Sequence, residues 1–185
     1  TIFCRLTAGV WMSRSSLVWG PFSIVWGLAI ALATVLLYKD REKPDRHIFL
    51  IGTLLGGAYE YACSVFTEIV FGQVFWDYSG IPFNLGGRIN LLYCFFWGIA
   101  AVVWIKLLYP RFSGWIERIP KIAGYIATWI LVVFMAADII VSAAALIRYD
   151  QRAGGSAAKS GWEQIIDENF DDDKIKQIYP NAKQR

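Results

Sequence analysis

Long apolar blocks separated by short polar stretches dominate this chain. Four blocks reach the length at which a helix crosses a bilayer, which is about 20 mainly apolar residues. They run roughly over residues 21–38, 48–71, 89–109 and 122–147. The pattern therefore predicts an all-α fold, a polytopic transmembrane helix bundle with four full spans.

Helix-breaking residues and changes of composition predict where the parts of the chain begin and end. The charged run KDREKPDRH ends the first block, Pro21 suits the first helical position of that block, and Pro110 is expected to stop the third. We expect residues 1–20 to be the end of a partial N-terminal helix and a turn. Residues 21–148 then form the transmembrane helical bundle, and 149–185 are a linker and a polar tail with a short helix near 162–166.

Composition agrees with a membrane protein. Charged residues make up 18% of the chain and apolar residues 56%, whereas a soluble domain usually carries about 25% charged residues. The nine Trp, nine Tyr and twelve Phe are typical of chains whose aromatic rings sit at the headgroup level. The net charge of +3 comes from scattered basic residues, which argues against a nucleic-acid partner.

The cysteines and the one histidine do not form a metal or cofactor motif. Cys4, Cys63 and Cys94 lie far apart in apolar surroundings, and no pair has the spacing of metal ligands. We therefore expect free thiols, no metal site and no cofactor.

Lys and Arg residues predict the orientation of the bundle. Four lie in residues 39–46 and four in 106–121, whereas residues 72–88 hold only Arg88. By the positive-inside rule the first two regions are cytoplasmic and the third is exterior. The basic residues near the start of the tail leave the side of the tail open.

Glu60 lies near the middle of the second block. Gly52, Gly56, Glu60 and Ser64 recur every four residues and so share one helix face. Gly52 and Gly56 form a GxxxG motif, which lets another helix pack closely. A charge at this depth is costly, so it faces the bundle interior or a cavity. Glu60 is therefore a candidate for a transport path or a cation or proton site, or it is a carboxyl group that holds helices together.

Two further acids lie inside predicted spans. Asp138 stands in the fourth block with Ser142 one turn later, so the same two interpretations apply to it. If Asp138 and Glu60 face each other, their like charges favour a shared proton or a bound cation. Glu68 lies a turn from the end of its block, and a position at the membrane interface also explains it.

The connection FGQVFWDYSGIPFNLGGRIN, residues 71–90, combines aromatic residues, turn formers and isolated polar residues. Non-helical backbone near a membrane needs protein or water around its polar groups. It is either a re-entrant or lid-like loop over a cavity, with Asp77 and Arg88 as a pair, or an interfacial hairpin. Its candidate site residues are Trp76, Asp77, Tyr78, Asn84, Arg88 and Asn90.

Several of these motifs resemble a bacterial family of small membrane proteins, the putative ABC transporter type IV or CmpB-like family. The pattern WDYS..PFN..GR followed by WG corresponds to residues 76–79, 82–84, 87–88 and 97–98, and Glu60 falls on a glutamate typical of the preceding helix. Residues 19–22 and 26–27 match a YGPF..-.YG segment, although Ile24 replaces a common proline and Ser15-Ser16 an Arg-Gly pair. The ending Tyr179-Pro180-Asn181 matches a YPN ending seen in many members.

The resemblance implies a fold of five helices, with the segment TIFCRLTAGV as the trailing end of a helix that is incomplete here. It also implies a membrane transport component in the cell membrane. The GxxxG face and the intramembrane acids favour a permease-like subunit, with Glu60, Asp138 and Glu68 as candidates along a path. The bilayer is its first partner; a second copy of the chain and an ATPase or other membrane protein are further candidates. Two alternatives stay open, a membrane enzyme acting on a lipid or lipid-linked substrate and a non-catalytic scaffold.

Overall fold

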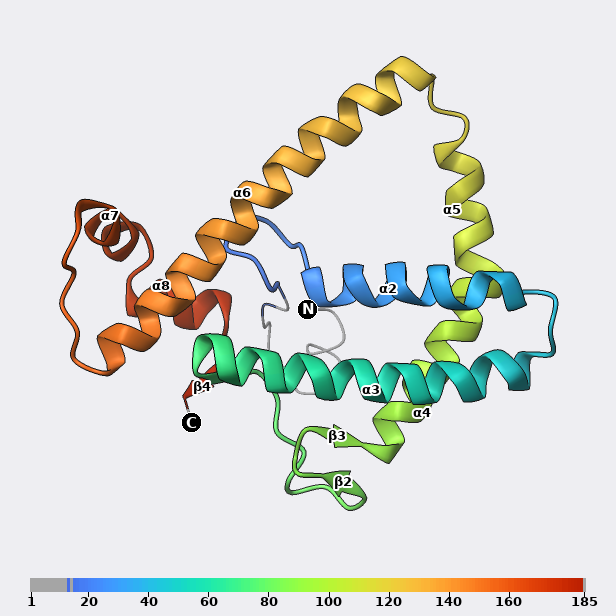
Figure 1. The fold of residues 1–185 in the computed structure, drawn as a ribbon, viewed down its shortest axis with the longest axis horizontal. Coiled ribbons are helices and arrows are strands. Elements are labelled where there is room, and N and C mark those ends of the chain that lie inside the picture. The colour runs from blue at the N-terminus through green and yellow to red at the C-terminus, as the bar shows by residue number, and fades with distance from the viewer. Residues whose placement is uncertain (1–12, 14, 185) are drawn as a thin grey trace. The chain divides into compact units, whose positions relative to one another are not determined.

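The computed structural model describes residues 13 and 15–184 (Figure 1), so the predicted partial helix at 1–10, with Cys4, lies outside the described residues. The described helices are α2 (Ile24–Leu37), α3 (Asp45–Phe71), α4 (Leu91–Val103), α5 (Tyr109–Ile116), α6 (Lys121–Ala153), α7 (Gly161–Asn169) and α8 (Asp172–Ile178). A 3-10 turn η1 (Tyr38–Asp40) follows α2, and a π-helical segment η2 (Trp104–Leu108) joins α4 to α5. Short strands pair antiparallel, β1 (Gln73–Val74) with β4 (Lys183–Gln184) and β2 (Asn84–Leu85) with β3 (Ile89–Asn90).

Three helices in the described part of the chain are long and apolar enough to cross a membrane. They are α3, the continuous stretch Leu91–Ile116 through η2, and α6, and only 22–28% of the most apolar part of each is buried. Large apolar side chains such as Ile69 and Ile122 remain 78% exposed. Water-soluble monomers rarely expose so much contiguous apolar surface, so the prediction of an all-α membrane protein is confirmed.

The first predicted span is shorter than expected, and a full count of four spans is not confirmed. α2 has 14 residues, or about 21 Å of helix, which is less than the roughly 30 Å of a hydrocarbon core. The chain before it turns instead of extending the helix. Ser16 Oγ accepts the Ile24 N–H at 2.7 Å, the Phe22 carbonyl accepts the Ser16 N–H at 3.0 Å, and Gly20 has a φ of +75°. These bonds place the start of α2 at Ile24 rather than Pro21.

The prediction that Pro110 stops the third span is wrong, because helix continues to Ile116. A proline has no N–H to donate, and its ring collides with the carbonyl four residues earlier. Here the helix widens into η2 just before the proline, and the Tyr109 N–H bonds the Trp104 carbonyl five residues back. This π-helical turn lets the helix pass Pro110 without a break.

The chain divides into two compact units. One, the bundle unit, contains Val25–Val65 and Asp77–Val132; the other, the tail unit, contains the described residues up to Ile24, Phe66–Trp76 and the described residues from Val133 onward. At one end of the bundle unit, Lys106 Nζ donates to the Lys43 carbonyl at 2.8 Å and pairs with Asp45 at 3.3 Å. Lys106, which begins the second region predicted to be cytoplasmic, therefore lies against the first such region at this end of the unit.

In the tail unit, the last part of α6 packs against the polar tail. Its core consists of Ala145, Leu146, Phe170, Ile175 and Tyr179. The predicted short helix near 162–166 is present as α7, whereas α8 was not predicted. α6 itself runs to Ala153, past the point at which the tail was expected to begin.

A buried ion pair joins α6 to α7. Arg148 is 1% exposed and donates to both carboxylate oxygens of Asp167, from Nε at 3.0 Å and from Nη2 at 2.6 Å, and to Gln151 Oε1 at 2.7 Å. Arg152 also donates to Asp167, and it pairs with Asp172 at 2.8 Å. These bonds, that of Arg148 first, lower the pKa of Asp167. Burial raises the pKa of Tyr179 to about 12, so its hydroxyl remains a donor to the Ser16 carbonyl.

The Arg148–Asp167 pair predicts a pH-dependent tail. Because the folded pKa of Asp167 lies below its unfolded value of about 3.9, its stabilisation is complete above that value and is lost as pH falls through the folded pKa. Asp167→Asn leaves Arg148 buried without its charged partner and should cost about 3 kcal/mol at pH 7. Thermal unfolding followed by circular dichroism at pH 7 and pH 3 measures both effects.

Glu168→Gln, an exposed change on the same helix, is the control. An equal loss of stability in both variants would contradict the ion-pair explanation.

Candidate functional site

Small residues bring α3 and α4 into close contact in the bundle unit. A Cβ added to Gly52 would lie 2.5 Å from the Cβ of Ala101, and one added to Gly56 would lie 2.3 Å from the Cβ of Trp97. Gly98 on α4 is equally tight, because its added Cβ would meet Thr53 Oγ1 at 2.3 Å. Larger residues at these positions would push the two helices apart.

The carboxylate of Glu60 lies on the same face of α3, one turn after Gly56. Glu60 is 8% exposed, and each of its oxygens accepts a hydrogen bond. The Tyr78 hydroxyl donates to Oε1 at 2.7 Å, and the indole N–H of Trp97 donates to Oε2 at 3.0 Å. Hydrogen bonds to both oxygens compensate a buried carboxylate for part of its lost hydration.

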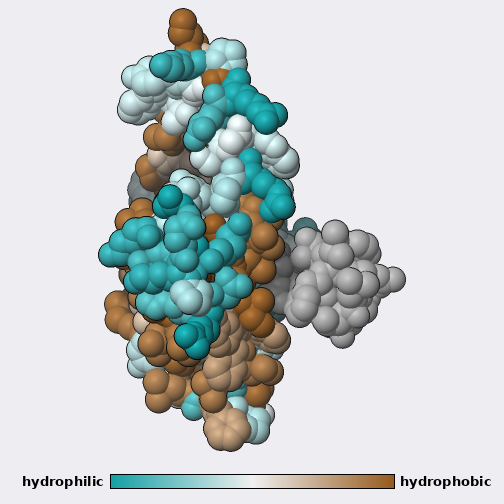
Figure 2. All heavy atoms as spheres, turned by 90° about the vertical axis from the view of Figure 1, so that its right-hand side faces the viewer, coloured by the Kyte–Doolittle hydropathy of each residue, from teal (hydrophilic) through white to brown (hydrophobic). Residues whose placement is uncertain are grey.

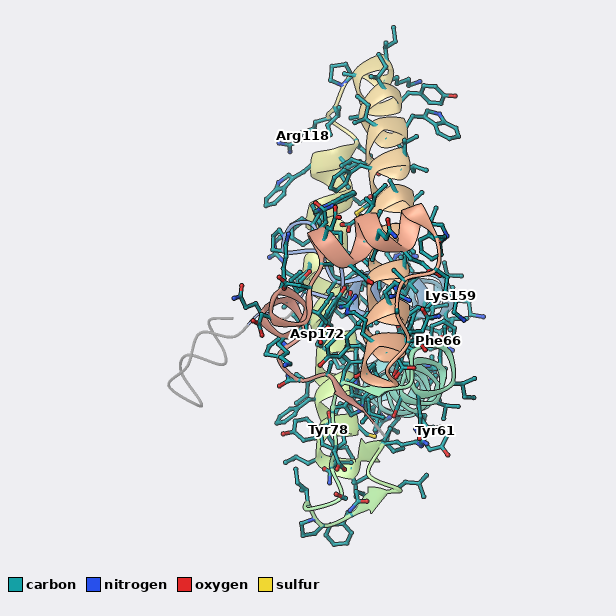
Figure 3. All side chains as sticks on the ribbon, turned by 90° about the vertical axis from the view of Figure 1, so that its left-hand side faces the viewer. Tyr61, Phe66, Tyr78, Arg118, Lys159 and Asp172 are labelled. Carbon is teal, nitrogen blue, oxygen red and sulfur yellow. The ribbon has the colours of Figure 1, made fainter. Side chains whose placement is uncertain are left out.

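Tyr78 and Trp97 approach Glu60 from different elements. Trp97 comes from α4, and Tyr78 comes from the connection between α3 and α4 (Figure 3). The Tyr78 ring stacks on Tyr93 with centroids 4.8 Å apart, and its backbone N–H donates to the Gly87 carbonyl at 2.8 Å. Glu60 therefore links α3, α4 and the connecting segment 77–90, which we call the polar loop.

Three of the candidate site residues in the polar loop form hydrogen bonds with the backbone of the loop itself. Asp77 Oδ1 accepts the Ser79 N–H at 2.9 Å, and Asn84 Oδ1 accepts the Gly87 N–H at 2.9 Å. Asn90 is 1% exposed; it donates to the Pro82 carbonyl at 2.7 Å and caps α4 by accepting the Leu92 N–H at 2.9 Å. These side chains satisfy backbone groups that a membrane environment would otherwise leave unpaired.

Glycine at position 87 permits this tight fold of the polar loop. Its φ is +69°, and a Cβ there would lie 2.7 Å from Asp77 Oδ1. Arg88 follows and reaches back to α3, where Nη1 donates to Ser64 Oγ at 3.1 Å and the guanidinium lies 5.9 Å from the centre of the Tyr61 ring. Tyr61 itself projects from α3 (Figure 3).

Asp138 is a second buried carboxylate, in the tail unit. It is 0% exposed, and its Oδ1 accepts the Trp19 N–H and the Ser142 hydroxyl, each at 3.2 Å. Ser142 Oγ in turn accepts the Val18 N–H at 2.9 Å. Among the residues that the structure describes, nothing bonds its other oxygen, Oδ2. Glu60 and Asp138 thus take their hydrogen bonds from separate units.

The remaining candidates belong to the tail unit or to helix packing. Glu68 and Trp76 lie in its segment Phe66–Trp76, and both are half-buried. Cys63 and Cys94 are free thiols, and Cys94 is buried against Gly57. No group of three His, Cys, Asp or Glu in the described chain is placed to hold a metal ion.

Trp97 and Arg148 make central contacts that the sequence pattern does not predict. Trp97 belongs to the WG motif, but the signal that links it to Glu60 is chemical: a buried carboxylate needs donors, and tryptophan offers only an N–H. Arg148 is a basic residue near a helix end, where exposure to the interface is the usual expectation.

These features define the class: an α-helical membrane protein with two buried carboxylates, one of which, Glu60, is bonded by aromatic side chains. A family model described as Putative ABC-transporter type IV matches residues 1–143. The chain therefore belongs to this family, as its motifs suggested, and the match ends within α6. Neither the curated proteins nor the solved structures contain a significant match to it.

The Tyr78–Glu60 bond predicts the behaviour of the polar loop. Tyr78→Phe keeps the ring but leaves Glu60 Oε1 without this donor, which costs about 1–3 kcal/mol. Backbone amides of residues 77–90 should then exchange with deuterium about tenfold faster. Tyr93→Phe is the control, because the Tyr93 ring stacks on Tyr78 while its hydroxyl bonds nothing within the described chain. Unchanged exchange in Tyr78→Phe would show that the hydroxyl does not hold the loop.

Proposed function

We propose that this chain is a permease-like subunit of a membrane transport system, crossing the cell membrane several times. Membership of a family described as ABC-transporter type IV supports transport. The observation that carries the proposal is Glu60, a carboxylate buried in a helix long enough to span the bilayer. Such groups are costly and mark ion, proton or substrate pathways by default.

Glu60 has the properties of a switch between the helices and the polar loop. Its two oxygens bond donors from two different elements, Tyr78 and Trp97. A proton or cation that neutralises the carboxylate weakens both charge-assisted hydrogen bonds at once. We propose that this change releases the polar loop from α3 and opens the path at its predicted exterior end.

Asp138 is proposed as a second site that binds the transported proton or cation. It is fully buried in the longest apolar helix, and its Oδ2 has no bond from the described residues. An acceptor of this kind suits a transferred proton or cation. Glu68, near the end of α3, is proposed as a further proton or cation site.

The rival functions receive less support. A lipid-processing enzyme would use Asp77 and Arg88, but Asp77 accepts the loop's own Ser79 N–H and Arg88 donates to Ser64 of α3. In the tail, Asp167 and Asp172 bond Arg148 and Arg152, so much of its acidic character is used within the chain rather than for a partner.

An ATPase partner is proposed as the source of energy, because the family is described as ABC-transporter type IV. The basic end of the bundle unit, predicted to be cytoplasmic, is the surface on which we expect it to dock. Gly52 and Gly56 already pack against α4, so a homo-oligomer would use another face.

Glu60→Gln tests the transport proposal. Glutamine removes the charge and can accept only one of the two hydrogen bonds, so flux of protons or monovalent cations through purified protein in liposomes should fall at least tenfold. An enclosed pH-sensitive dye and a potassium electrode measure the two fluxes. Glu117→Gln, a change in the turn that follows α5 and outside the site, should leave both unchanged. Flux that persists in Glu60→Gln would remove Glu60 from the mechanism.

A further inference from the structure

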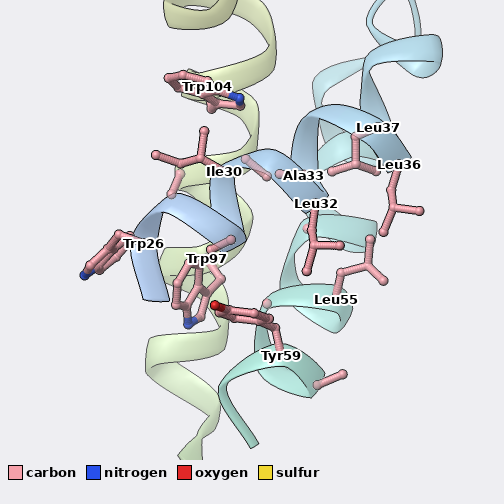
Figure 4. A pocket seen from close by; sticks show the side chains of 16 residues that line it. Trp26, Ile30, Leu32, Ala33, Leu36, Leu37, Leu55, Tyr59, Trp97 and Trp104 are labelled. Atoms are coloured by element: carbon pink, nitrogen blue, oxygen red, sulfur yellow. The ribbon is translucent and has the colours of Figure 1, made fainter. Parts of the chain in front are cut away.

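A groove of about 290 Å³ lies within the bundle unit, between α2, α3 and α4 (Figure 4). Small residues leave the space, and aromatic rings and leucines surround it. The small residues are Ala29, Ala33, Gly52, Gly56, Ala58, Ala100 and Ala101; the large ones include Trp26, Trp97, Trp104, Tyr59, Leu32 and Leu55.

The groove offers an occupant little to hydrogen-bond. The indole N–H of Trp104 donates to Thr34 Oγ1 at 2.8 Å, that of Trp97 donates to Glu60, and the Tyr59 hydroxyl donates to the Val25 carbonyl at 2.6 Å. With these polar tips bonded inside the protein, the lining selects hydrocarbon over a polar ligand.

The α2 residues that line the groove span about the thickness of one lipid leaflet. They run from Trp26 to Leu37, which corresponds to about 17 Å of helix. Half of a bilayer's hydrocarbon core is about 15 Å. A single acyl chain entering from the headgroup level would therefore run along these residues.

The end of the groove at Leu36, Leu37 and Trp104 adjoins the basic end of the bundle unit. The turn at 38–46 and Lys106 carry five basic and three acidic side chains, a net charge of +2. Figure 2 shows hydrophilic residues gathered over this turn, with hydrophobic surface beside them. Some charges pair internally, as Lys43 does with Asp40 at 3.1 Å, and the excess is positive. Such a site favours an anionic headgroup.

We propose that the groove between α2, α3 and α4 binds one acyl chain of an anionic phospholipid, whose phosphate lies at the basic turn that follows α2. The apolar lining selects the chain, the span of its α2 residues matches one leaflet, and the excess positive charge selects the anionic headgroup. This site does not depend on whether Glu60 takes part in transport.

Tryptophan fluorescence provides the test, because Trp26, Trp97 and Trp104 line the groove. The full chain is placed in bilayers of unlabelled phosphatidylcholine that contain a small fraction of phosphatidylglycerol or phosphatidylcholine with brominated acyl chains, which quench tryptophan. Brominated phosphatidylglycerol should quench at an about tenfold lower mole fraction than brominated phosphatidylcholine.

Two matched pairs of variants separate the acyl-chain site from the headgroup site. Ala33→Leu fills the groove and should bring phosphatidylglycerol quenching to the phosphatidylcholine level, whereas Ala31→Leu on the same helix, outside the lining, should not. Lys39→Gln with Arg41→Gln should lower the preference for phosphatidylglycerol about tenfold. Arg118→Gln with Lys121→Gln removes equal charge elsewhere and should leave the preference unchanged.

Equal quenching by the two lipids in the unmodified chain would overturn the proposal, whatever the variants do. A photoreactive residue in place of Leu32 gives an independent result. Adducts with phosphatidylglycerol support the proposal, and adducts with a second copy or with another segment of the chain overturn it.

Discussion

The close contact of Gly56 with Trp97 is the constraint on which the bundle unit depends. Only a residue without a Cβ lets the Trp97 side chain lie directly against the α3 backbone. From that position the indole N–H reaches Glu60, one turn further along α3. The small-residue face and the buried carboxylate are thus parts of one arrangement, because the glycine admits the donor that the acid requires. Tyr78 completes it from the polar loop.

The tail unit also contains a buried carboxylate, but different groups donate hydrogen bonds to it. Asp138 takes its hydrogen bonds from a backbone N–H and a serine hydroxyl rather than from aromatic side chains. A third buried charge, Arg148, has a bidentate carboxylate partner in α7. Glu60, Asp138 and Arg148 thus each have hydrogen-bond partners nearby, as a low-dielectric interior requires, and among the described residues only Asp138 Oδ2 of their charged atoms lacks one.

Sequence reasoning predicted what depends on local composition. Hydrophobic block length identified the membrane helices, and the four-residue spacing placed Gly52, Gly56 and Glu60 on one face. It failed where hydrogen bonds outside the regular α-helical pattern set the ends of a helix. The turn at Ser16 and Gly20 makes α2 begin later than predicted. The π-helical segment η2 lets the third span continue beyond Pro110. The partners of Glu60 were likewise beyond sequence reasoning, because Tyr78 and Trp97 are 18 and 37 residues away in sequence. No periodicity links residues so far apart.

The π-helical turn at Trp104–Leu108 fixes how the rest of that helix is rotated. Each residue of an α-helix advances about 100° around the axis, so the extra residue in the π-helical turn rotates everything after it by about that angle. This rotation accompanies the contacts of Tyr109 with Tyr38, at 4.7 Å between ring centres, and of Phe112 with Trp104, at 5.9 Å. Deleting one residue here would yield a regular helix whose aromatic side chains face another direction. The number of residues in this segment therefore sets the direction in which Tyr109 and Phe112 face.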